Sequence, residues 1–159
     1  MCSRLLEKYP LMWHGEFTIK TFRAMVRLNY ILGNQRVATG ALSMPSIRVA
    51  KRLRQENMPE LPLELPEDSC CVLTALPYGQ NEEEVASRTK ALSEGMVNYL
   101  RSKRAVGISV APGEEYVVKV CIPSEMTASF LARIAPDWYH TICDKEHLLV
   151  LVVKLNTKK

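Results

Sequence analysis

The residues best suited to chemistry in this sequence are cations gathered in one short stretch, 46–54. Arg48, Lys51, Arg52 and Arg54 fall within seven positions, with no acidic residue among them. Like charges held this close repel one another, and a bound anion would relieve the repulsion. The planar guanidinium of Arg can bind two oxygens of a phosphate or carboxylate at once. This basic stretch therefore indicates an anion-binding surface, although a solvated helix face would have a similar composition.

We expect the basic stretch to form a short helix. Ser46 is a suitable N-cap, and Val49 and Leu53 repeat at the i, i+4 spacing of one helical face. Arg54 falls on the other side of such a helix, unless the helix ends near Leu53. The remaining polar residues share one stripe: Arg48, Lys51, Arg52 and Gln55.

Motifs for catalysis or cofactor binding do not occur in the sequence. There is no glycine-rich phosphate loop, no HExxH and no GxSxG. His14, His140 and His147 are far apart, and a nucleophilic pair of Cys143 with His140 stays open but unsupported. The five cysteines are odd in number and show no CxxC spacing, so we expect reduced, mostly buried thiols in an intracellular protein. We therefore predict no metal, no cofactor and no enzymatic activity.

Charge is distributed unevenly along the 159 residues. The net charge is +8 over residues 1–54, −7 over 55–99 and +3 over 100–159. The length suits one domain with a sizeable core, and we assign residues 1–159 to a single domain. No apolar run is long enough to span a membrane. A basic first third folded onto one face would create a positive patch, which suggests an acidic partner.

Hydrophobic periodicity predicts the elements that position these charges. Period-two patterns and apolar runs predict strands at 13–20, 22–32, 37–42, 69–76, 108–110, 116–122 and 147–155. Helices are expected at 3–8, 46–54, 81–104 and 124–134, with another turn or helix from Pro136. The proline-rich segment 59–66 should be extended. No regular βαβ repeat occurs, so a mixed, largely antiparallel sheet or barrel with helices around it fits best.

Two further elements supply polar groups near the expected surface. The strand at 13–20 alternates so that Lys20 falls on its polar side. In the long helix at 81–104, Tyr99 and Lys103 are i, i+4 neighbours and can present a ring and a cation side by side. The buried stripe of that helix is expected to be Val85, Thr89, Leu92, Met96 and Leu100.

The order of these signals resembles the SPOC domain of the split-ends (Spen) family of nuclear transcriptional regulators. The resemblance runs from about residue 5 to about 155 and depends on several pieces in register. They are 9–15 with 17–20, Gly33-Asn34, 47–54, 71–77, 97–107 and the closing strand from His147. Departures are local: the loop between Leu42 and Arg48 is short, and Glu114-Glu115 follows a trimmed loop.

The resemblance implies a distorted, mostly antiparallel seven-stranded β-barrel flanked by several α-helices, an α+β fold. It also implies a nuclear, monomeric interaction module that binds phosphoserine in acidic peptides. Such peptides come from corepressor tails and from the C-terminal repeats of RNA polymerase II. By resemblance, the phosphoserine-binding residues, here called the clamp residues, are Lys20, Arg48, Arg52, Arg54, Tyr99 and Lys103.

Three other functions remain open at this point. The basic first third could bind RNA, although Trp13, Phe17 and Phe22 occur in strand patterns and are expected in the core. RNA binding would strengthen with oligonucleotide length and weaken steeply with salt. An adaptor for unphosphorylated acidic peptides would bind both forms of one peptide equally. An enzyme of unrecognised type would need a catalytic constellation that the sequence does not display.

Overall fold

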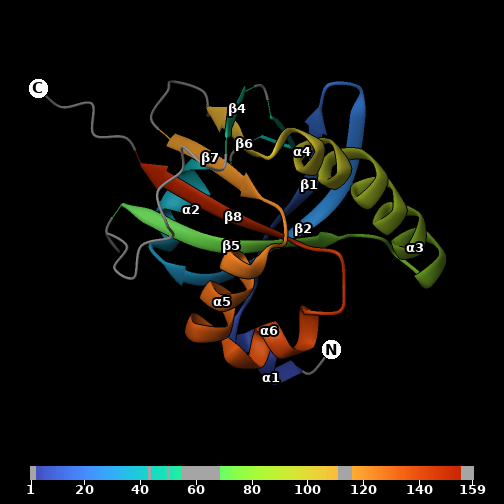
Figure 1. The fold of residues 1–159 in the computed structure, drawn as a ribbon. Helices are drawn as coiled ribbons and strands as arrows, with labels where there is room; N and C mark the ends of the chain where they lie inside the picture. Colours follow the sequence, from blue (N-terminus) through green and yellow to red (C-terminus); the bar gives the residue numbers. More distant parts are fainter. Residues whose placement is uncertain (1–2, 43, 50, 55–68, 111–115, 155–159) are drawn as a thin grey trace, which may run out of the picture.

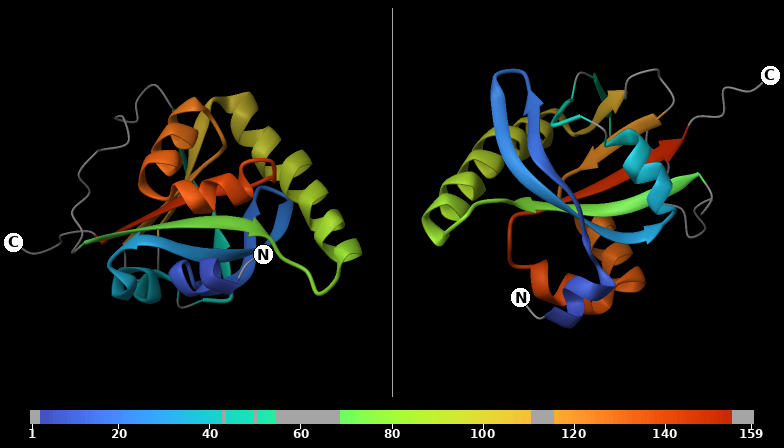
Figure 2. Two further views of the ribbon diagram at one scale, coloured as in Figure 1. Left: turned by 90° about the horizontal axis from the view of Figure 1, so that it is seen from below. Right: turned by 180° about the vertical axis from the view of Figure 1, so that it is seen from behind.

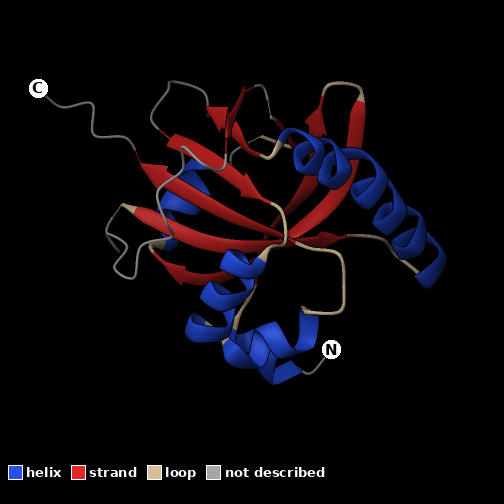
Figure 3. Cartoon of the chain, in the orientation of Figure 1, coloured by secondary structure: helices blue, strands red, loops and turns tan. Residues whose placement is uncertain are grey.

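The structure is a computed structural model that describes residues 3–42, 44–49, 51–54, 69–110 and 116–154, with the backbone alone for Ser3, Val110 and Lys51–Arg54. The strands are β1 (Leu11–Ile19), β2 (Phe22–Gly33), β3 (Ser46–Arg48), β4 (Lys51–Arg54), β5 (Cys70–Pro77), β6 (Ala105–Val110), β7 (Tyr116–Cys121) and β8 (Leu148–Lys154). The helices are α1 (Ser3–Lys8), α2 (Gln35–Ala41), α3 (Glu82–Ala91), the π-helix η2 (Leu92–Val97), α4 (Asn98–Lys103), α5 (Glu125–Ile134) and α6 (Pro136–Ile142). Figure 3 separates the two kinds of element by colour.

The strands form one mixed sheet that curls almost into a barrel (Figure 1). Their order is β3-β1-β2-β5-β8-β7-β6-β4, and every pairing is antiparallel except β1 with β3. The two outermost strands, β3 and β4, are consecutive in the chain and separated only by residues 49–50. The predicted fold class, a mostly antiparallel barrel flanked by helices, is confirmed, with eight strands among the described residues where seven were expected.

The inside of the barrel is one hydrophobic cluster. Strands β5 and β8 contribute alternate residues to it, including Leu73 from β5 and Val150 from β8. Helix α2 closes this cluster with Val37, and η2 and α4 contribute Leu92 and Leu100, all buried. Because Leu92 and Leu100 are buried in this cluster, the interior of the barrel fixes where η2 and α4 lie.

A second cluster covers the outer face of the central strands. The intervening residues of β5 and β8, such as Val72 and Leu149, pack there against α5 and α6. Trp138 of α6 is fully buried in this layer and donates its Nε1–H to Thr74 Oγ1 at 3.0 Å. Both faces of β5 and β8 are thus buried, which explains their nearly continuous apolar sequences. No helix in these described ranges is both long and apolar enough to cross a membrane.

Two predicted elements are wrong. Residues 37–42 were expected as a strand but lie in α2, where the side chain of Asn34 accepts a hydrogen bond from Arg36 N at 2.9 Å and caps the helix. The basic stretch was expected as a helix but forms β3 and β4. Residues 46–49 alternate between exposed and buried, with Ile47 and Val49 inside, and β-branched residues favour strands. Free edges of β1 and β6 supply its backbone partners.

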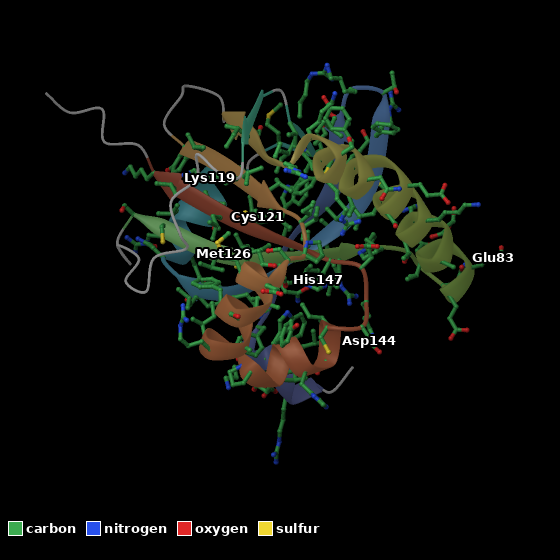
Figure 4. The ribbon with its side chains drawn as sticks, viewed as in Figure 1. Glu83, Lys119, Cys121, Met126, Asp144 and His147 are labelled. Carbon is green, nitrogen blue, oxygen red and sulfur yellow. The ribbon has the colours of Figure 1, made fainter. Side chains whose placement is uncertain are left out.

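The long helix predicted at 81–104 is present as three consecutive segments, α3, η2 and α4. Asn81 caps it as expected, accepting from Glu84 N at 2.8 Å. Leu92, Met96 and Leu100 are buried as predicted, whereas Val85 is 36% exposed. Helix α3 has no buried residue and projects from the barrel, with Glu83 near its outer end (Figure 4). The predicted extended segment 59–66 lies outside the described residues.

Candidate anion-binding site

The turn between β1 and β2 places Lys20 at the rim of the barrel. Lys20 is exposed and holds a left-handed backbone conformation, with φ 55°. Few residues other than glycine adopt that conformation, so the turn fixes where the Lys20 backbone lies. The β1–β2 hairpin projects beside η2 and α4, as two opposite views show (Figures 1 and 2).

Strand β3 places Arg48 next to this hairpin. The register of the parallel β1–β3 pair sets Arg48 opposite Thr18, two residues before Lys20. Arg48 is exposed, while Ile47 and Val49 on either side of it are buried. The backbone N–H of Val49 donates to Thr18 O at 2.7 Å, so the pairing of this segment with β1 extends one residue beyond Arg48. The structure therefore brings Arg48 and Lys20 to the same rim.

Helix α4 contributes a ring and a cation to the rim. Lys103 Nζ lies 5.9 Å from the centroid of the Tyr99 ring, so the two are neighbours as predicted. The half-buried Tyr99 packs against the interior cluster, and its ring centroid is 6.3 Å from that of Phe22. Phe22 follows the hairpin turn directly and therefore joins the hairpin to α4.

Strand β4 lies beside the end of α4. Arg52 and Arg54 are paired with Gly107 and Ala105 of β6, and Ala105 is only two residues beyond Lys103. The side chains of Arg52 and Arg54 lie outside the described residues. Their backbone positions alone place them at the β6 edge next to α4.

The described cations of this rim have no acidic partner. Lys20, Arg48 and Lys103 are exposed, and none has a carboxylate within 4.0 Å in the parts of the chain that the structure describes. Uncompensated cations beside a half-buried aromatic ring can accept an anion without first breaking an ion pair. The rim therefore combines positive charge with an aromatic wall.

Phe22 lies at the rim and not in the core, where its strand pattern placed it. Phe17 is fully buried as expected, but Phe22 is 37% exposed and contacts the rim instead of the core. Phe22 is on the same face of β2 as the buried residues Ala24 and Val26. It is also the first residue of β2, where the barrel ends. The alternation pattern cannot reveal where a strand leaves the barrel, so this position had no clear signal.

Three of the described thiols are buried. Cys70, Cys71 and Cys121 are buried thiols, and burial raises the pKa of Cys71 and of Cys121 to about 12. Such thiols are poor nucleophiles at neutral pH because the thiolate is the reactive form. Figure 4 shows Cys121 and His147 on different elements of the molecule. Across the described part, no three His, Cys, Asp or Glu side chains are arranged to hold a metal ion.

Comparison with known proteins identifies relatives over nearly the whole chain. The SPOC domain family profile matches residues 3–155. Human Msx2-interacting protein is 32% identical over 165 residues, covering 96% of this chain, and Drosophila melanogaster protein split ends is 32% identical over 162 residues, covering 93%. The chain spans only 4% and 3% of the lengths of these two relatives. The crystal structure of the SPOC domain of human PHD-finger protein 3 has the same fold, with a TM-score of 0.61 at 13% identity, covering 94% of this chain and 99% of that one.

Proposed function

Because this chain belongs to the SPOC domain family, we propose that it is an interaction module of transcriptional regulation that binds phosphoserine in acidic peptides. Family membership supports a protein-interaction role in transcription. The phosphoserine specificity and the clamp residues are our inference from the resemblance and from the geometry of the rim. The observation on which the proposal depends is the convergence of Lys20, Arg48 and Lys103 beside the Tyr99 ring at one rim, where none of the three cations has a carboxylate within 4.0 Å in the described ranges.

The chemistry of the rim suits a phosphate group. A phosphoserine has about −1.5 to −2 charges and three acceptor oxygens, so it can engage several cations together. Each charge-assisted hydrogen bond contributes about 1.5–3 kcal/mol, and ordering a flexible peptide offsets part of the total. A micromolar complex, about −8 kcal/mol, is the expected result. Corepressor tails and RNA polymerase II C-terminal repeats are the proposed sources of the peptide, in the nucleus.

Fluorescence polarisation with one serine-rich acidic peptide, phosphorylated and unphosphorylated, tests the proposal. We expect the phosphorylated form alone to bind, and Arg48→Ala and Arg52→Ala each to weaken binding at least tenfold with little change in melting temperature. Lys90→Ala removes the same charge from exposed α3 and serves as the matched control. Undiminished affinity in both arginine variants would refute the proposed clamp. Tighter, salt-sensitive binding of a single-stranded RNA would favour nucleic-acid recognition instead.

A further inference from the structure

A second group of cations lies on the outer face of the β1–β2 hairpin, away from the rim. Arg27 of β2 is directly opposite His14 of β1 in the antiparallel register. The His14 ring stacks on Tyr78, with centroids 4.9 Å apart and planes 14° from parallel. Arg88 of α3 donates from Nη1 to Tyr78 O at 3.0 Å and holds the residue in place. The β1–β2 hairpin and α3 therefore meet around Tyr78, which directly follows β5.

Arg27 is the unusual member of this group. It is half-buried, and its Nε atom is buried without a hydrogen-bond partner. Its guanidinium has no carboxylate within 4.0 Å in the described chain, and Glu16 is two pairs of residues further along the hairpin. Burial lowers the pKa of Arg27, and the nearby Tyr78 opposes that shift. A partly desolvated cation left without an acceptor is costly, and an anion would offset that cost.

Arg23 shows how different Arg27 is from an ordinary surface arginine. It lies on the same strand and the same face, opposite Thr18, and it is exposed. An exposed guanidinium is fully hydrated and its interactions are screened, whereas an anion beside the half-buried Arg27 meets a lower local dielectric. Directly opposed residues have Cβ atoms only about 4.5–5.5 Å apart, so one carboxylate could contact both Arg27 and His14.

We propose that Arg27, His14 and Tyr78 form a second anion-binding site, separate from the clamp residues, that takes the carboxylate side chains of an acidic protein segment. Lys20 is six positions beyond His14 in the chain, which is about 20 Å along an extended strand. The site does not depend on the proposed phosphoserine function. A nucleic acid fits less well, because His14 already covers one face of the Tyr78 ring, which leaves less of it for a base to stack on.

Nuclear magnetic resonance on the full chain tests this site. The probe is an acetylated, amidated Asp-Glu hexamer, with the Asn-Gln hexamer as the neutral control, at constant ionic strength. We expect saturable shifts at the Arg27 Nε–Hε group and at the amides of His14 and Tyr78. Arg27→Gln should weaken binding about tenfold or more, while Arg23→Gln, which removes the same charge, should have little effect. In Arg48→Ala, which disables the proposed clamp, these shifts should persist, so failure of either site can be distinguished.

Several outcomes would overturn the second site. They are no saturable shift, equal weakening by Arg23→Gln and Arg27→Gln, or tighter binding of a decameric oligouridine at the same amides. Thermal melts of Arg27→Gln and of Arg27→Met separate binding from folding. Since Arg27 Nε has no acceptor in the described fold, neither variant should lower the melting temperature appreciably. A large decrease in both would assign Arg27 a structural role instead.

Discussion

Guanidinium geometry is the property that distinguishes the clamp arginines from the lysines of this protein. Lys keeps the charge but replaces a planar fork by a point charge, so it cannot bind two phosphate oxygens in the same way. We therefore expect Arg52→Lys to weaken phosphopeptide binding about tenfold, measured by calorimetric titration. The control is Lys90→Arg on exposed α3, which should have no effect. Equal affinity of the wild type and the Arg52→Lys variant would mean that charge alone attracts the peptide.

Asp137 offers a pH-dependent test of the helical layer. Its carboxylate accepts from Tyr9 Oη at 2.7 Å and from Lys8 Nζ at 3.0 Å, and these bonds lower its pKa from 3.8 to about 2. A folded-state pKa below the unfolded value stabilises the fold above about pH 4, and this contribution is lost as the pH falls towards 2. The stability difference between the wild type and Asp137→Asn should therefore be present at pH 6 and vanish near pH 2.

Denaturant unfolding at several pH values measures this difference. The Asp137 side chain is 41% exposed, so solvent screening keeps the effect modest. Asp144→Asn is the matched control, because Asp144 is 80% exposed and 3.8 Å from Lys145. A difference for Asp137→Asn that does not change with pH would show that the ionised carboxylate is not the cause.

At the scale of elements, the π-helix η2 positions the aromatic part of the rim. Gly95 of η2 lies against Phe22, and a Cβ added there would be 3.0 Å from the ring. Gly95→Ala should therefore displace the hairpin from α4 and lower phosphopeptide affinity severalfold, although Ala has the higher helix propensity. Polarisation assays beside thermal melts measure both effects. Gly95→Ala should lower stability less in a Phe22→Ala background than in the wild type, because the ring is gone, and an equal loss in both would place the conflict elsewhere.

The elements also show what sequence patterns can predict. Strands β1, β2, β5 and β8 were predicted because their alternation or apolar runs match one or two buried faces. The cap at Asn81 was predicted from side-chain chemistry. Strands β3 and β4 were not predicted, because both a helical and a strand period fit so short a segment. Pairing with the free edges of β1 and β6 makes the segment a strand and not a helix. Lys20 and Arg48 come close together only through the tertiary fold, and no local sequence pattern contains that information.

At the scale of the whole molecule, the segment with the arginines is also the segment that closes the barrel. It leaves the edge of β1 as β3 and joins the edge of β6 as β4. Val49 lies at the crossing, 4% exposed, and its Cγ1 occupies the space that a Cβ on Gly107 would need, 2.7 Å from that position. The absence of a side chain at Gly107 lets the chain cross there. Barrel closure and the position of the clamp arginines should therefore depend on the same contact.

Val49→Ala tests that dependence. Removing two buried methyl groups should lower the free energy of unfolding by about 1–3 kcal/mol, measured by denaturant titration. Because Val49 follows Arg48 and precedes β4, the same change should also weaken phosphopeptide binding, whereas Arg48→Ala should weaken binding alone. Val85→Ala removes the same groups from a 36% exposed site on α3 and should change neither quantity. If Val49→Ala lowers stability and leaves affinity intact, the arginines are held independently of the closure of the barrel.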